Sequence, residues 1–248
     1  MVLQRSSLII LCSLLAAVYG RSLPSFIKPC KRSDPNLEKC LIEVIDSIRP
    51  NLAKGIPEMR IPPLDPFHVP QVVLDQGSAS VNFRANFKNI IAHGARNFNL
   101  TSAKINFDEP SLSIDVGFPA IRVFSDYNIT GKVLVVPIKG NGKFEGNFTN
   151  IFANVKFLGK YNKKADSTFL GIKERKINFK IGSLKVHFSN LFNGNKQLSE
   201  TTNVFINENW RDILQEINPL IEDTIGEVMM QIIKGFLDLY SLEDLIPN

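Results

Sequence analysis

The chain has 248 residues and a net charge of +5, and 44% of its residues are hydrophobic while 21% are charged. This composition excludes intrinsic disorder and supplies enough apolar residues for a sizeable buried core. Basic residues are scattered among acidic and polar ones, and the densest run, residues 160–164, fits a solvated loop. Because nucleic-acid binding needs a basic face, we expect no nucleic-acid partner.

The first 20 residues have the features of a secretory signal peptide. Arg5 precedes a short apolar run over residues 8–18, and the Val-Tyr-Gly sequence at residues 18–20 supplies a small-residue cleavage site. The run is well short of the roughly 18 apolar residues that a membrane-spanning helix requires. We therefore predict a secreted, extracellular protein with one domain, residues 21–248, whose net charge is +4 once Arg5 is lost.

Removal of the signal peptide takes away Cys12 and leaves two cysteines, Cys30 and Cys40. An even pair at short spacing in a secreted chain predicts a disulfide, which the chain-entropy model credits with about 3 kcal/mol of stabilisation. Asp34 then caps a predicted short N-terminal helix, in which apolar residues recur at helical spacing until Pro50 ends it.

Residues 56–70 are rich in proline and predict a rigid crossover into a sheet. From residue 78 to 192, apolar and polar residues alternate with a period of two, which is typical of antiparallel strands with one dry and one solvated face. Turn sequences at residues 108–110, 140–142 and 193–195 are expected to separate the strands. Since no helical pattern interrupts this region, a doubly wound parallel sheet is excluded.

Residues 207–240 return to helical spacing and predict one long amphipathic helix. A helix of about 28 residues measures roughly 42 Å, and Pro219 is expected to kink it. Charged residues along its polar face rule out a membrane span. The pattern as a whole predicts an α+β fold with an antiparallel sheet, a short N-terminal helix and a long C-terminal helix.

Three N-x-T sequons begin at Asn99, Asn128 and Asn147. Each has an apolar residue between two polar ones, so a strand would turn the middle residue inward and leave both polar residues on the solvated face. These middle residues are Leu100, Ile129 and Phe148. We expect at least one sequon to carry a glycan, which would help to keep an exposed sheet soluble.

The sequence carries no recognisable catalytic or metal-binding motif. None of its three histidines has a second ligand-type residue at metal spacing, and no CxxC, HExxH or G-x-S-x-G occurs. The glycines at residues 140–142 lack the rest of a phosphate-binding motif and are interpreted as a hairpin turn. We therefore expect neither an enzyme nor a metal or cofactor site.

Several segments together resemble the takeout and juvenile-hormone-binding protein family of insects. They are the cysteine pair around a Ser-Asp-Pro sequence, residues 61–66, residues 127–146 and residues 205–210. The resemblance implies a highly curved antiparallel sheet wrapped around the long helix, related to tubular lipid-binding domains, with an elongated cavity for terpenoid or fatty-acyl ligands. It also implies secretion into haemolymph or around sensory tissues and, as for several members, a link to circadian and feeding physiology.

The resemblance leads us to expect a monomeric carrier of a small hydrophobic ligand whose membrane contacts are transient at most. The lack of a cysteine after Cys40 favours the takeout branch, because haemolymph hormone carriers usually bear a second disulfide. It weakens juvenile hormone as the assumed ligand, while a juvenile-hormone-like molecule stays among the expected ligands. Two alternatives stay open: an interaction or signalling protein whose interior is filled by its own side chains, and a lipid-transfer protein that acts at membranes.

Apolar residues on the inward strand phase and on the long helix are expected to line the cavity, with Tyr127 and Trp210 as candidate polar contacts. The candidate lining residues are Phe83, Phe87, Ile105, Phe107, Ile114, Val116, Phe118, Tyr127, Ile129, Phe148, Phe179, Val186, Phe188, Trp210, Leu214, Ile217, Ile221, Val228 and Ile232.

Overall fold

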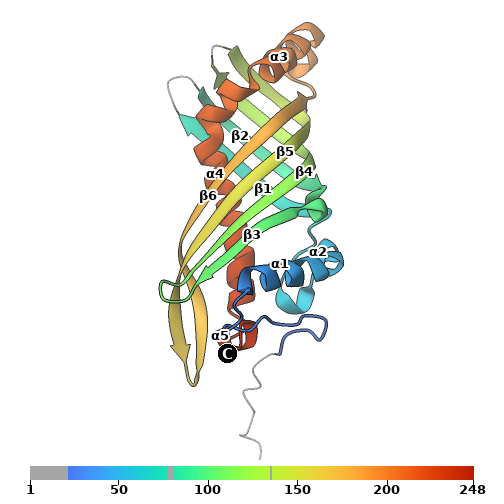
Figure 1. The fold of residues 1–248 in the computed structure, drawn as a ribbon. Helices are drawn as coiled ribbons and strands as arrows, with labels where there is room; N and C mark the ends of the chain where they lie inside the picture. The colour runs from blue at the N-terminus through green and yellow to red at the C-terminus, as the bar shows by residue number, and fades with distance from the viewer. Residues whose placement is uncertain (1–21, 78–80, 135) are drawn as a thin grey trace, which may run out of the picture.

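In the computed structural model, residues 22–77, 81–134 and 136–248 are described, and the predicted signal peptide lies outside them. Six strands form one antiparallel sheet in the order β1-β2-β4-β5-β6, with β3 also paired to β4. The sheet curls into a half-tube, and the long helix α4 runs along it (Figure 1). The strands are β1 (Phe67–Gly77), β2 (Val81–His93), β3 (Asn99–Asn106), β4 (Ser111–Val133), β5 (Val136–Lys164) and β6 (Ser167–Phe188).

Helices lie at both ends of this half-tube: α1 and α2 with α5 at one end, α3 at the other (Figure 1). The α-helices are α1 (Leu37–Ser47), α2 (Arg49–Lys54), α3 (Lys196–Glu208), α4 (Trp210–Leu237) and α5 (Leu242–Leu245). In the described part of the chain, the short 3-10 helices are η2 (Pro57–Met59), η3 (Ala95–Asn97) and η4 (Phe192–Gly194). The prediction of an antiparallel sheet, a short N-terminal helix and a long C-terminal helix is confirmed.

The N-terminal region confirms the disulfide and corrects the helix boundaries. Cys30 and Cys40 are bonded, with their Cα atoms 6.0 Å apart, and they tie the lead-in segment to α1. Asn36, not Asp34, precedes α1, and the Asp34 carboxylate accepts the Asn36 backbone N–H at 2.8 Å. Pro50 does not end helical structure because it lies in the first turn of α2, where a backbone N–H is not needed.

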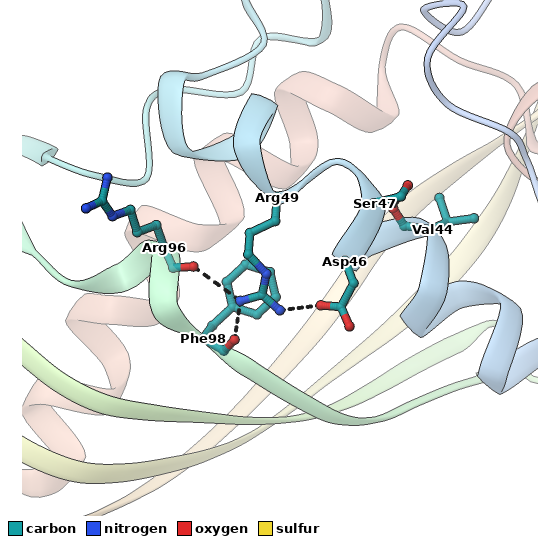
Figure 2. A network of polar contacts seen from close by, with 6 residues as sticks. All are labelled: Val44, Asp46, Ser47, Arg49, Arg96 and Phe98. Carbon is teal, nitrogen blue, oxygen red and sulfur yellow. Dashed lines mark hydrogen bonds and ion pairs between the residues drawn. The ribbon is translucent and has the colours of Figure 1, made fainter.

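A single arginine fastens α2 to the start of β3, as Figure 2 shows. The Arg49 guanidinium donates to the carbonyls of Arg96, at 3.2 Å, and of Phe98, and it pairs with the Asp46 carboxylate. The guanidinium also lies 4.0 Å from the centre of the Phe98 ring. Because Phe98 is buried, this contact fixes the N-terminal helices against one end of the sheet.

Two expectations about the strands are wrong. The sheet begins in the proline-rich segment, because β1 starts at Phe67 and accommodates Pro70 as an edge strand, where a missing N–H is tolerated. Residues 160–164, expected to be a loop, are the end of β5.

The predicted hairpin at residues 140–142 is also wrong, because these residues lie inside β5. The two glycines reflect close packing of β5 against another segment, not a turn. A Cβ atom on Gly140 would lie 3.0 Å from the Leu191 Cα atom, and one on Gly142 would lie 2.5 Å from the Ser189 carbonyl oxygen. These glycines let β5 approach the segment that follows β6, where Gly140 and Leu191 form an isolated bridge.

The inward-facing side chains change phase at one level of the sheet. Phe148 faces inward and packs against one core cluster, and Ile151 also faces inward, on the side of the buried Val155. In a regular strand, residues 148 and 151 would point to opposite faces. Asn150, between them, has a left-handed φ of 51°, and Asn89 of β2 has one of 52° beside a register shift. Such irregularities bend strands, and these two help to curl the sheet.

The core is divided into separate clusters. The upper cluster, at the α3 end, has Phe83, Ala85, Tyr127, Ile129, Val133, Ile138, Val186, Phe188, Leu191, Ile206 and Ile213. The α1 cluster has Phe98, Leu100 and Ala103 and packs against α1. The lower cluster has Val155, Phe157 and Ile177 and packs against Met229, Met230 and Ile233. A fourth cluster joins the N-terminal segment to the C-terminal end through Ile48, Ile56, Met59 and Tyr240.

Candidate ligand-binding site

The concave side of the sheet is covered by α4, which contacts both edge strands, β1 and β6 (Figure 1). Arg175 of β6 fixes the helix in place: its guanidinium lies 2.6 Å from the Asp223 carboxylate and 2.8 Å from that of Glu227. The guanidinium packs directly over Gly226, where an added Cβ atom would lie only 2.1 Å from Nε. α4 therefore covers the concave side of the sheet from one edge strand to the other.

The upper end of this interior is bounded by α3, a helix that was not predicted from the sequence. Its Asn203 side chain pairs with the backbone of Phe188, accepting at 2.8 Å and donating at 2.9 Å. Asn207 does the same with Val186, at 2.8 and 2.7 Å. Two asparagines four residues apart thus provide hydrogen-bond partners for the free edge of β6. That spacing is the only feature of the sequence that could have indicated this contact.

Many of the predicted lining residues belong to the protein's own core. Five are buried within the upper cluster: Phe83, Tyr127, Ile129, Val186 and Phe188. Six are partly buried against the upper or α1 cluster: Phe87, Phe148, Ile217, Ile114, Val116 and Phe118.

The remaining candidates are partly exposed and belong to none of the clusters. Phe107 lies in the turn after β3, with the Arg32 guanidinium 4.3 Å from its ring centre, and Trp210 begins α4 beside Arg211. Ile105 lies near the end of β3. The others are Phe179, Leu214, Ile221, Val228 and Ile232, of which the last four are on α4.

The strand register adds three residues to the candidate lining that were not predicted from the sequence: Ile121, Ile151 and Ile181. Ile121 pairs with Phe148, and Ile151 pairs with Ile181, so they occupy the concave face between the upper and lower clusters. They lie next to the level at which the strands change phase. A prediction based on simple alternation therefore did not include them. We call the partly exposed set between the clusters the interior belt: Ile121, Ile151, Phe179, Ile181, Ile221 and Val228.

Polar groups in this region are few. The Tyr127 hydroxyl donates to the Ser189 carbonyl at 2.6 Å, and burial raises the pKa of Tyr127 to about 12, so this predicted ligand contact is committed to the protein backbone. In contrast, the buried Ser125 hydroxyl and the Asn218 side-chain oxygen have no hydrogen-bond partner among the described residues. Ser125 pairs with Phe144 and lies two residues from Tyr127, on the concave phase of β4.

The sequons fit the predicted strand register at two positions. Leu100 and Ile129 are buried, and the sequon asparagines and threonines beside them are exposed. Phe148 also lies on the concave phase, but Asn147 is half-buried and lines a polar cleft of about 590 Å³ between β5, β6 and α3. Asn128 lines a second polar cleft, of about 420 Å³, beside Arg84 and Lys88.

Within the described ranges, no group of three or more His, Cys, Asp or Glu side chains is arranged to hold a metal ion. Among the helices of that same part of the chain, none combines the length and apolarity needed to cross a membrane.

A curled antiparallel sheet closed by one long amphipathic helix over an apolar interior is a fold of hydrophobic-ligand-binding proteins. The chain matches the model of the haemolymph juvenile hormone binding protein family over residues 8–247, and it belongs to that family. The crystal structure of Takeout 1 from Epiphyas postvittana has the same fold, with a TM-score of 0.77 at 20% identity over 90% of this chain and 100% of that one.

Two similar proteins are both named circadian clock-controlled protein daywake. The one from Drosophila melanogaster is 25% identical over 224 residues, covering 87% of this chain and 85% of that protein. The one from Drosophila yakuba is 24% identical over 227 residues, with the same two coverages.

Proposed function

We propose that this chain is a secreted, non-catalytic carrier that holds one small hydrophobic ligand, of terpenoid or fatty-acyl type, between the sheet and α4. The observation that carries this proposal is the interior belt. Its residues are apolar and lie between core clusters, yet they keep partly exposed surfaces. An apolar molecule covering those surfaces would gain the free energy of removing them from water.

The expected affinity follows from the area involved. Burying about 400 Å² of apolar surface is worth roughly 10 kcal/mol, and association costs at least about 4 kcal/mol. The remaining 6 kcal/mol or so corresponds to a dissociation constant of tens of micromolar. Tighter binding requires polar contacts, for which the unpartnered Ser125 hydroxyl and Asn218 oxygen are better suited than Tyr127.

Ligand retention tests the proposal directly. The chain is secreted from insect cells, and native mass spectrometry of the purified protein should show a bound apolar molecule that organic extraction releases. Val228→Trp fills the interior belt and should reduce the retained fraction at least several-fold. Lys234→Trp introduces the same side chain at an exposed polar position of the same helix, away from the face that carries Ile221 and Val228, and should not. Repeatedly empty wild-type protein would support an interaction protein with a filled core instead.

Ser125 provides an independent prediction about ligand chemistry. Ser125→Ala removes a buried hydroxyl that lacks a partner, so extracted protein should become more stable by roughly 1–3 kcal/mol. The same substitution should weaken binding of a ligand that carries a hydroxyl, carboxyl or ester group. Urea unfolding and competition with a fluorescent fatty acid measure the two effects, and unchanged affinity for every such ligand would remove Ser125 from the site.

The remaining parts of the proposal concern processing and physiology. We propose cleavage after residue 20, use of at least one sequon and membership of the takeout branch. The names of the daywake proteins support circadian control of this chain as well. Mass spectrometry of insect-cell material that finds residue 1 present and all three sequons bare would contradict the secretory part.

A further inference from the structure

The end of β5 and the start of β6 form a two-stranded ribbon that we call the tip ribbon, residues 159–172. β4 pairs with β5 only as far as Leu158, whereas β5 and β6 stay paired to Lys164 and Ser167. Figure 1 shows this hairpin projecting past the turn between β3 and β4, at the end where α5 lies. The ribbon extends beyond the edge of β4 and is held there by contacts with α5 and with the turn after β3.

The tip ribbon carries an unpaired basic cluster. Lys160, Lys163 and Lys164 are exposed, and none of them forms an ion pair with a described residue. Asp166, in the turn, is the only acidic residue among residues 159–172. Charge of one sign is therefore concentrated on a narrow projection, although basic residues are scattered over the rest of the sequence.

The groups around the ribbon are mixed in sign. The Thr168 N–H donates to Glu243 of α5 at 3.2 Å, and the Tyr161 hydroxyl donates to the Phe107 carbonyl at 2.7 Å. Asp108 and Glu109 follow Phe107, while the Arg32 guanidinium lies over its ring. Asp108 and Glu109 are thus at the base. Glu243 contacts the ribbon beside its turn, because Thr168 pairs with Lys163, and the lysines of β5 still outnumber the acidic groups there.

Apolar side chains accompany these lysines. Tyr161 is 37% exposed and pairs with Leu170, while Phe169 lies on the other face of the ribbon. The Lys164 ammonium is 4.8 Å from the centre of the Phe169 ring. Lysines that surround partly exposed aromatic and aliphatic groups are characteristic of segments that sit at the interface between anionic headgroups and acyl chains.

We propose that the tip ribbon docks the protein on an anionic phospholipid surface. The lysine ammonium groups contact the lipid headgroups, and Tyr161, Phe169 and Leu170 lie at the level of the interface. A membrane fits better than an acidic protein, because a narrow ribbon is too small for a stable protein interface of about 800 Å² per partner. Fluid lipids, by contrast, arrange themselves around separate lysines. This docking goes beyond the carrier function and does not depend on it.

Vesicle co-sedimentation of the full secreted chain tests the proposal. The protein should bind phosphatidylcholine vesicles that contain phosphatidylserine, should not bind vesicles of phosphatidylcholine alone, and should be released by salt. A lysine close to an anionic surface strengthens binding roughly fivefold. The variant K160Q/K163Q/K164Q should therefore bind on the order of 100-fold more weakly while retaining its hydrophobic ligand as the wild type does.

The matched control is K132Q/K139Q/K180Q, which removes the same charge from exposed strand positions elsewhere. It should bind anionic vesicles within about threefold of the wild type, since its lysines lie beyond roughly a screening length of the docked surface. Equal weakening in both variants would show unspecific electrostatic attraction and overturn the proposal. A wild-type chain that ignores anionic vesicles would overturn it as well, whether or not ligand is retained.

Discussion

Single polar groups hold the apolar half-tube in shape. The Tyr127 hydroxyl reaches the Ser189 carbonyl from within the upper cluster, and it thereby ties β4 to the segment after β6. The Arg175 guanidinium, in a side chain that is 20% exposed, spans two carboxylates of α4. Neither group belongs to the interior belt, but each joins two of the elements that surround it. Their removal should therefore have measurable consequences.

Tyr127 should make stability depend on alkaline pH. Its folded-state pKa, about 12, is above the usual value of 10, so the folded protein holds the phenolic proton more tightly than the unfolded chain does. This contribution is complete below about pH 10 and is lost as the pH rises toward 12. Tyr127→Phe should cost about 1 kcal/mol at neutral pH through the lost hydrogen bond and should flatten the alkaline decline.

Urea unfolding of wild type and Y127F at several pH values, followed by circular dichroism, measures this effect. The difference between the two proteins isolates Tyr127 from the lysines that titrate in the same range. Parallel curves for the two proteins at alkaline pH would show that the raised pKa of Tyr127 does not contribute.

Two glycines of α4 offer a matched comparison. Gly226→Ala should displace Arg175, because the added Cβ atom would lie 2.1 Å from its Nε atom. The free energy of unfolding should fall by a few kcal/mol. Gly235→Ala meets its first neighbour only at 3.8 Å and should stabilise the helix by up to about 1 kcal/mol. Thermal unfolding of both variants decides the matter, and equal effects at the two positions would contradict the role of Arg175.

At the scale of elements, α3 protects an edge of the sheet. β6 is an edge strand, and such strands pair with other chains unless they are covered. Asn203 and Asn207 cover it with side-chain amides that reproduce the donor and acceptor pattern of a neighbouring strand. α3 therefore bounds the upper end of the interior and also shields the sheet from intermolecular pairing.

Asn207→Ala should expose this edge. The substitution leaves the backbone N–H and carbonyl of Val186 without their partners, which should cost roughly 1–3 kcal/mol for each group that water does not reach. Light scattering during mild heating should show earlier aggregation than in wild type. Thr201→Ala, at an exposed position of the same helix, is the control and should behave like wild type. Identical scattering from all three proteins would contradict a protective role for α3.

At the scale of the whole molecule, separate clusters divide the core and leave the interior belt between them. The upper cluster holds β2, β4 and β6 with α3, and the lower cluster holds β5 and β6 with the second half of α4. We expect a protein built in this way to be stabilised by its own packing where the clusters lie and by the proposed ligand between them. This division connects the stability of the fold to the proposed function.

Removal of the ligand should therefore lower stability, and its return should restore it. A ligand at 100 times its dissociation constant adds about 2.7 kcal/mol to the free energy of unfolding. The melting temperature of organic-extracted, refolded protein should rise with added fatty acid or terpenoid, and the rise should be much smaller in the variant V228W. A melting temperature that is indifferent to every apolar ligand would argue for a filled interior.

Much of this architecture could be predicted because it depends on local patterns. The period-two segments, the long amphipathic stripe and the cysteine pair are each repeated or closely spaced in sequence, so strands, α4 and the disulfide were predicted. The lining residues were predicted less well. Ile121, Ile151 and Ile181 were missed because the phase change at Asn150 breaks simple alternation, and Phe83 and Phe188 were included although they are buried core.

By itself the sequence determined the type of each main element and which of its faces is apolar, since both follow from residue spacing along one segment. Only the tertiary structure decided which apolar residues fill the core and which stay partly exposed. That outcome depends on contacts between residues far apart in the chain, such as Gly140 with Leu191 and Arg175 with Gly226. Such contacts leave no periodic signal, because their partners meet only when the sheet has curled around α4.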